Sequence, residues 1–227
     1  CLFGKPTVIN NVETLGCVPD IVDRGAAWFK SVGAETAPGP KLYCLSGHVR
    51  RPGVYERPMG TPLRELIEEH AGGIRDGRRL GFVIPGAAAS TALLPSEIDV
   101  PMDFDSLKKL GTELGAGGIS VMDETVCIVE TLERLARFFR HESCGKCVPC
   151  REGTVWQHRL LERLVDGSGD ARDIELLGSV SRQLVGRTLC ALGAFAAAPQ
   201  LGALGKFPEH FAAHAAMAGR CPLTAVA

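Results

Sequence analysis

Four cysteines have the spacing of ligands to a metal centre. Three of them, Cys144, Cys147 and Cys150, fall within one stretch of seven residues. The fourth, Cys190, follows after a gap of 39 residues. Two-residue spacers let three thiolates turn toward one centre, and a remote fourth thiolate completes the coordination. Because cubane iron–sulfur clusters are held by four cysteine sulfurs, the spacing predicts a 4Fe-4S cluster and one-electron chemistry.

Two other uses of these cysteines remain open from the sequence. A structural zinc site also uses four thiolates, but it usually divides them into two Cys-x-x-Cys pairs rather than three and one. A disulfide framework requires pairing, whereas the chain has 9 cysteines, an odd number. The spacing therefore favours iron–sulfur chemistry over a zinc site or a set of disulfides.

The residues around the cysteines supply positive charge and backbone freedom. Thiolates accumulate negative charge, which Lys146 and Arg151 can balance. The loop leads into the N-terminus of an expected helix, whose positive dipole end stabilises thiolates. Gly145 permits a tight turn. His141 precedes Cys144 by three residues, and we hypothesise that it tunes the cluster through a hydrogen bond.

The other histidines and cysteines show no clear ligand pattern. His210 and His214 are four residues apart on an expected helix and are able to bind a metal, but a solvated helical face explains them better. Four other cysteines are interpreted as small hydrophobic side chains: Cys17, Cys44, Cys127 and Cys221.

Composition and charge restrict the classes of partner. Of the 227 residues, 45% are hydrophobic, which is enough for a sizeable core, and the net charge is −1. Acidic and basic residues are interspersed, so no nucleic-acid partner is expected. No apolar stretch reaches the roughly 20 residues of a membrane span, so no direct membrane insertion is expected. Reduced, unpaired cysteines favour the cytoplasm.

The first segment is expected to contain a short strand and an interrupted helix. Residues 6–9 have strand-type side chains, and residues 12–28 are predicted to be mostly helical. Asn11 is a candidate N-cap that accepts hydrogen bonds from the backbone N–H of Glu13 or Thr14. Residues 33–40 have the composition of a linker.

A mixed unit is expected next. Thr61 is the predicted N-cap of a helix that begins at Pro62 and stops at Gly72. The order strand, strand, helix, strand predicts a small β-grasp module. The predicted strands cover residues 41–46, 54–56, 80–85 and 119–122.

The last part of the chain is expected to be helical. Asp123 is a candidate N-cap for a first helix, after which the cysteine loop interrupts the pattern. A second helix is predicted to end near Gly167, a third at Gly186, and a fourth follows Pro199. Four helices with short connections predict a four-helix bundle. The apolar face of the first helix comprises Ile128, Leu132, Leu135 and Phe139.

Three segments resemble motifs of one protein family. Residues 142–154, which include Cys-Gly-Lys-Cys-Val-Pro-Cys, resemble the cluster motif of the flavin-carrying, NADH-oxidising subunit of respiratory complex I. Residues 190–193 resemble the fourth-ligand segment of that family, and residues 5–15 resemble its flavin-contacting segment. The resemblance covers essentially the whole chain. Flavoproteins of NAD-reducing hydrogenases and NAD-linked formate dehydrogenases share these motifs and remain alternatives.

The resemblance implies an α+β architecture in three parts. Residues 1–36 correspond to the tail of an α/β domain that binds FMN and NADH. Residues 40–122 correspond to a soluble-ligand-binding β-grasp module, and residues 123–227 to a helical 4Fe-4S cluster domain. The family's glycine-rich flavin loop belongs to an N-terminal half that this sequence, which begins with Cys1, does not contain. We therefore expect that half as a partner, and we expect no reaction with NADH from this chain alone.

The resemblance also implies cofactors and partners. In this family FMN accepts a hydride from NADH, and electrons pass singly to the 4Fe-4S cluster and on to the next subunit of an NADH:quinone oxidoreductase. The expected partners are a thioredoxin-like 2Fe-2S subunit and an iron–sulfur electron-relay subunit. The expected location is cytoplasmic, peripheral to the inner face of the membrane through the complex. The positions that match flavin contacts are Ile9, Asn10, Asn11, Thr14, Ala191 and Leu192.

Overall fold

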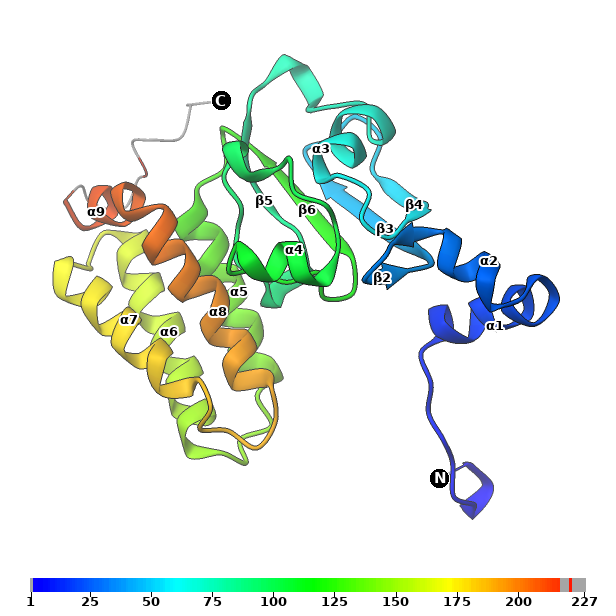
Figure 1. Ribbon diagram of the computed structural model, residues 1–227. Helices are drawn as coiled ribbons and strands as arrows, with labels where there is room; N and C mark the ends of the chain where they lie inside the picture. The colour runs from blue at the N-terminus through cyan, green and yellow to red at the C-terminus, as the bar shows by residue number, and fades with distance from the viewer. Residues whose placement is uncertain (1, 217–220, 222–227) are drawn as a thin grey trace.

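The computed structural model describes residues 2–216 and residue 221. Three regions follow one another along the chain: an N-terminal helical segment, a small sheet with short helices, and a group of longer helices (Figure 1). The expectation of a chain that mixes small sheets with several helices is confirmed. Among the described residues, no helix combines the length and the apolar character that crossing a membrane requires.

The N-terminal segment is helical where the sequence predicts it. α1 (Val12–Arg24) begins after Asn11, whose side-chain oxygen accepts hydrogen bonds from the backbone N–H groups two and three residues later (2.8 and 3.4 Å). The predicted N-cap is therefore confirmed. Gly25, with φ of 84°, separates α1 from α2 (Ala26–Ser31), which explains the predicted interruption.

Two expectations for the N-terminal segment are wrong. Residues 6–9 form no strand, because no described strand lies beside them, and their apolar side chains stay exposed. A 3-10 turn precedes them at Leu2–Gly4. Residues 33–40, expected as a linker, contain a small hairpin of β1 (Gly33–Ala34) and β2 (Ala37–Pro38), whose pairing satisfies backbone groups that a linker would leave to water.

A four-stranded sheet in the order β4-β3-β6-β5 forms the centre of the second region. β3 pairs antiparallel with β4 and parallel with β6, and β5 pairs antiparallel with β6. Tyr43 and Leu45 in β3 are buried while their neighbours are exposed, as the alternating pattern predicts. The strands are β3 (Pro40–Gly47), β4 (Gly53–Pro58), β5 (Leu80–Ile84) and β6 (Gly118–Asp123).

The helix between β4 and β5 starts differently from the prediction. The Thr61 hydroxyl donates to the carbonyl oxygen of Pro58 (2.8 Å), so it does not cap α3 (Leu63–Glu65). α3 continues into a π-helical turn (Leu66–His70), and Gly72 with φ of 77° follows, as predicted. Three 3-10 turns cover Arg75–Gly77, Ala87–Ala89 and Pro95–Glu97.

One short helix in this region has no counterpart in the sequence prediction. α4 (Phe104–Lys109) has 6 residues, which is too few for a clear periodic pattern. The side chain of Asp103 caps it by accepting a hydrogen bond from the backbone N–H of Ser106 (2.7 Å). Leu107 is its buried residue and packs into the same core as Tyr43.

The third region consists of helices that lie side by side (Figure 1). Ile128, Leu132 and Phe139 are buried on one face, as predicted. Pro199 lies inside a helix rather than before one, because its buried ring packs in the core and compensates for the missing backbone donor. The helices are α5 (Ile128–Glu142), α6 (Val148–Asp166), α7 (Ala171–Leu184), α8 (Leu192–Lys206) and α9 (Pro208–Ala216).

Asp123 is not a helix N-cap, since it ends β6 and the next helix begins at Ile128. Its buried carboxylate accepts a hydrogen bond from the backbone N–H of Thr125 (3.0 Å), and it pairs with His48 (2.9 Å) and Arg78 (3.3 Å). Burial alone raises the pKa of this carboxyl, but hydrogen bonds from Thr125 and His48 outweigh burial and lower the pKa to about 2.

Asp123→Asn is expected to destabilise the chain by about 2 kcal/mol at neutral pH, because the carboxylate ties β6 to two neighbouring segments. The folded pKa lies below the unfolded value of 3.8, so this stabilisation is complete above pH 4 and disappears as the pH falls through about 2. Urea unfolding of both proteins at pH 7 and pH 2.5 measures it. Asp23→Asn, at an exposed carboxylate in α1, is the control. A difference between Asp123→Asn and the unmodified chain that is equal at both pH values would contradict this account.

Candidate metal centre

The four predicted ligand cysteines lie at one end of the group of helices. Cys144 lies in the loop between α5 and α6, Cys147 occupies the N-cap position of α6, and Cys150 lies in its first turn. Cys190 lies in the loop between α7 and α8. Figure 1 shows both loops at the same end of the helices, so the fold brings a residue 40 positions away toward the three clustered cysteines.

A direct contact joins the two loops. The backbone N–H of Leu189 donates to Sγ of Cys147 (3.3 Å), one residue before Cys190. Hydrogen bonds from backbone N–H groups stabilise a thiolate, so this contact both aligns the loops and favours a charged ligand. The position of Cys147 at the start of α6 adds the positive end of the helix dipole.

The candidate ligand cysteines differ in how far they are exposed to water. Cys150 is buried and packs with Leu184 and Ala197, whereas Cys144 and Cys190 are exposed. This gradient allows the base of a cluster to be shielded from water while the rim remains open to a partner.

Local hydrogen bonds fix the loop that carries Cys144. Gly145 has φ of 76°, the left-handed conformation that its predicted turn requires. The Arg151 guanidinium donates to the carbonyl oxygen of Gly145 (2.9 Å) and pairs with Glu152 (2.9 Å). Ser143 Oγ lies 3.3 Å from Sγ of Cys150. Ser143 was not identified from the sequence, because a serine next to a cysteine carries no distinctive signal.

A zinc ion and a 4Fe-4S cluster require different distances between the four cysteine sulfurs. Four sulfurs around one zinc ion would lie about 3.8 Å apart, given Zn–S bonds of about 2.3 Å. Among the described residues, the Cys, His and carboxylate donors that lie within 4.8 Å of one another form a different group, outside these four cysteines. Sulfurs around a 4Fe-4S core lie farther apart because iron and sulfide separate them.

Gly193 determines how closely the Cys190 loop approaches α8. A Cβ atom added at Gly193 would lie 2.7 Å from the side chain of Thr188. The Thr188 hydroxyl in turn donates to the carbonyl oxygen of Cys190 (2.8 Å). Thr188 and Gly193 therefore position Cys190 without being candidates for metal binding themselves, which is why ligand spacing does not reveal them.

The predicted flavin-contacting positions fall into two separate groups. Ala191 and Leu192 directly follow Cys190 at the start of α8, so they lie at the cysteine end. The second group lies in the N-terminal segment, which Figure 1 shows away from the group of helices, so the structure does not bring the two groups together. The exposed residues of this second group are Ile9, Asn10, Asn11 and Thr14.

Glu13 anchors the segment that contains the second group. One carboxylate oxygen accepts a hydrogen bond from the backbone N–H of Leu42 (2.7 Å), and the other contacts the ammonium group of Lys41. Partial burial raises the pKa of Glu13, but the hydrogen bonds from Lys41 and Leu42 produce a net lowering. The carboxylate therefore fixes α1 to β3. A single glutamate in a polar helix gives no sequence signal of this contact.

Comparison with known families places a cluster-binding region over the same helices. Residues 130–214 match the NADH-ubiquinone oxidoreductase-F iron-sulfur binding region. Residues 42–84 match the SLBB domain.

The chain is also similar to whole proteins. It is 51% identical to the F 2 subunit of the NADH-quinone oxidoreductase of Rhizobium meliloti (strain 1021), over 97% of this chain and 52% of that protein. It is 48% identical to the F subunit of the NADH-quinone oxidoreductase of Rickettsia typhi (strain ATCC VR-144 / Wilmington), over 92% of this chain and 50% of that protein. The chain thus spans about half the length of the curated relatives it matches.

A solved structure shares the fold. The crystal structure of NAD+-reducing [NiFe]-hydrogenase in the air-oxidized state superimposes with a TM-score of 0.83 and 33% identity. The match covers 93% of this chain and 36% of the hydrogenase chain.

Gly193→Ala is expected to displace Thr188 and with it Cys190, at a cost of about 1–3 kcal/mol in stability and with a reduced iron content. Gly205→Ala, in the same helix, is the matched control, because an added Cβ there meets nothing within 4 Å. The control is expected to keep its iron and to be slightly more stable. Iron analysis and thermal unfolding of both variants test this, and equal iron content in the two variants would count against the positioning role of Gly193.

Proposed function

Because the chain is homologous over nearly its whole length to the F subunits of NADH-quinone oxidoreductases, we propose that it is the C-terminal, cluster-carrying part of an NADH-oxidising flavoprotein. In this proposal it accepts electrons from FMN at a 4Fe-4S cluster and passes them to the next protein of the complex. The observation that supports it most directly is the convergence of the Cys190 loop on the N-terminus of α6 through the Leu189–Cys147 hydrogen bond.

The proposed ligands are Cys144, Cys147, Cys150 and Cys190. When bound, the 4Fe-4S cluster supplies one-electron transfer between donors and acceptors. The chain's own residues hold the thiolates in place, exclude water at the base around Cys150 and donate a hydrogen bond to Cys147. We assign no acid–base residue, since hydride transfer to a flavin requires none from this region.

We further propose the division of the chain into three units. Residues 1–36 form the tail of the flavin domain, residues 40–122 a β-grasp module, and residues 123–227 the cluster domain. The mixed sheet, with its central β3–β6 parallel pair, supports the β-grasp assignment. The sequential packing of α5, α6, α7 and α8 supports a four-helix bundle in the third unit.

Flavin and NADH would be bound mainly by the half of the flavoprotein that this sequence does not contain. Ile9, Asn10, Asn11 and Thr14 are exposed, as residues that complete a site with another segment must be. The proposed partners are that N-terminal half, a thioredoxin-like 2Fe-2S subunit and an electron-relay iron–sulfur subunit. The proposed location is the cytoplasmic side of the membrane, with attachment through the complex.

Two alternatives differ from this proposal. The similarity to an NAD+-reducing [NiFe]-hydrogenase chain supports the equivalent flavoprotein of such a hydrogenase, or of an NAD-linked formate dehydrogenase, as the second candidate. The identity of co-purifying subunits distinguishes these enzymes. A zinc ion at the four cysteines, which would make the domain purely structural, is less compatible with their division into three and one along the sequence.

Cys190→Ser is expected to abolish the cluster, because only three thiolates remain. The unmodified chain, purified anaerobically, should contain about four irons and four sulfides and give an EPR signal after reduction with dithionite. Cys44→Ser is the matched control, since Cys44 is an exposed cysteine in β3. Stoichiometric zinc without sulfide, removed by Cys190→Ser, would overturn the electron-transfer proposal and leave a structural zinc domain.

The role of the N-terminal segment is tested after the missing half is supplied as a separate polypeptide. Reduction of the cluster by NADH is expected only when both halves are present, because the flavin site is shared. Asn10→Ala is expected to lower the FMN content of the mixture while the iron content stays unchanged. An FMN content that is equal in both mixtures would remove Asn10 from the proposed flavin site.

A further inference from the structure

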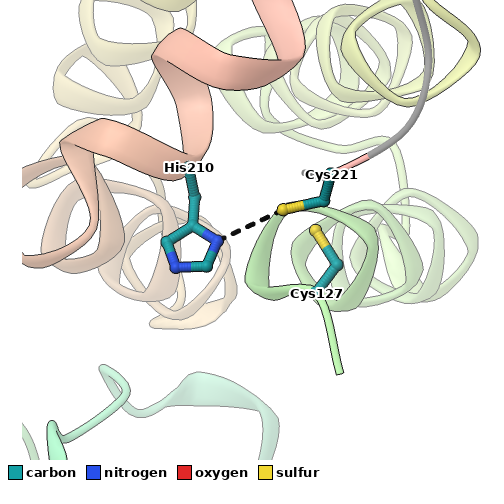
Figure 2. Close-up of side chains that lie close together, drawn as sticks. All are labelled: Cys127, His210 and Cys221. Carbon is teal, nitrogen blue, oxygen red and sulfur yellow. Dashed lines mark hydrogen bonds between the residues drawn. The ribbon is translucent and has the colours of Figure 1, made fainter. Parts of the chain in front are cut away.

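A second group of sulfur and nitrogen donors lies at the opposite end of α5 from the cysteine loop. Cys127 occupies the N-cap position of α5, His210 lies on α9, and Cys221 lies beyond α9 in the chain. Their donor atoms all lie within 4.8 Å of one another. Figure 2 shows the imidazole of His210 directed toward the two sulfur atoms, which approach it from separate segments.

The spacing of these donors is close to that of a tetrahedral zinc site. Zn–S bonds of about 2.3 Å and Zn–N bonds of about 2.0 Å place neighbouring donors about 3.3–3.8 Å apart. Nδ1 of His210 lies 3.4 Å from Sγ of Cys221, within that interval. The three donors therefore require only small shifts to surround one ion.

His214, on the next turn of α9, lies outside this group of three and contacts it through Cys127. Its Nε2 lies 3.1 Å from Sγ of Cys127, and its Nδ1 lies 3.0 Å from the carbonyl oxygen of Leu164. If Nδ1 carries the proton and donates to that carbonyl, the lone pair of Nε2 is directed at Cys127. A histidine metal ligand commonly has this arrangement, in which its second nitrogen donates to a backbone carbonyl.

Three of the four side chains are shielded from water, whereas that of His210 is 19% exposed. Cys127, His214 and Cys221 are 3%, 1% and 9% exposed. The ring of Phe207 lies 5.9 Å from the ring of His210 and closes one side. A solvated helical face, as the sequence suggested for His210 and His214, is therefore wrong for His214. Cys127 and Cys221 are buried in the hydrophobic core, as predicted, and each also contacts a histidine nitrogen.

This group cannot be part of the iron–sulfur site. α5 has 15 residues, so its two ends lie about 22 Å apart, with Cys127 before the first end and Cys144 beyond the second. Two thiolates and two imidazoles are donors that zinc prefers, whereas calcium and magnesium prefer oxygen. The donor set therefore selects the type of ion.

We propose that Cys127, His210, His214 and Cys221 bind one zinc ion that is independent of the iron–sulfur cluster. On binding, each thiol loses its proton to solvent and forms a Zn–S bond, so two protons are released and nothing is oxidised or reduced. The ion would link the start of α5 to α9 and to Cys221.

The test is the metal content of the full 227-residue chain, purified anaerobically from medium that contains both iron and zinc. One zinc per chain is expected in addition to iron. Cys221→Ser and His210→Ala are expected to lose the zinc and to keep iron and sulfide. Cys190→Ser is expected to do the opposite. Cys17→Ser, at a cysteine outside both groups, is the control and should keep both metals.

Three results would overturn the proposal. One is a chain with full iron content, less than about one tenth of a zinc per chain and no thiolate–cobalt absorption after Co²⁺ is added. Another is zinc that disappears in Cys190→Ser but persists in Cys221→Ser, since that ion would lie in the cysteine loop. The third is a disulfide between Cys127 and Cys221 found by peptide mapping. The cobalt titration uses the unmodified chain, so it remains decisive even if a variant fails to fold.

Discussion

The contact between the loop before α8 and the first turn of α6 is the constraint on which the candidate centre depends. Sequence spacing alone can cluster Cys144, Cys147 and Cys150, but the loop that carries Cys190 lies at the same end of the helices only because α7 and α8 return the chain there. The hydrogen bond from Leu189 to Cys147 marks the place where the two segments meet. Small side chains near this contact matter as much as the ligands themselves.

The two sides of the candidate centre differ in their exposure to water, which suits a redox cofactor. One side of the centre is apolar and closely packed, and the other side is open at Cys144 and Cys190. A cofactor held in such a site is insulated from the protein core and accessible to a neighbouring protein. At the far end of α5 a different set of donors comes from three segments, so candidate metal-binding side chains lie near both ends of this helix.

Local patterns predicted much of the fold, and contacts between distant segments explain what they missed. The face of α5 and the alternation in β3 follow from periodicity, and the cap at Asn11 from residue type. Asp123 was misassigned because its partners, His48 and Arg78, lie far away in the sequence. A buried environment keeps Pro199 inside a helix that residue type alone would end there. The spacing of Cys144, Cys147 and Cys150 is a local signal, whereas the position of Cys190 depends on the path of α7 and α8; the role of all four as ligands remains a proposal.

Native mass spectrometry of the anaerobically purified chain tests the central claim most directly, because it weighs the intact cofactor together with the protein. The account predicts a single species whose added mass includes four irons and four sulfides. A chain that carries metal ions but no inorganic sulfide would contradict the assignment of the four cysteines to an iron–sulfur cluster.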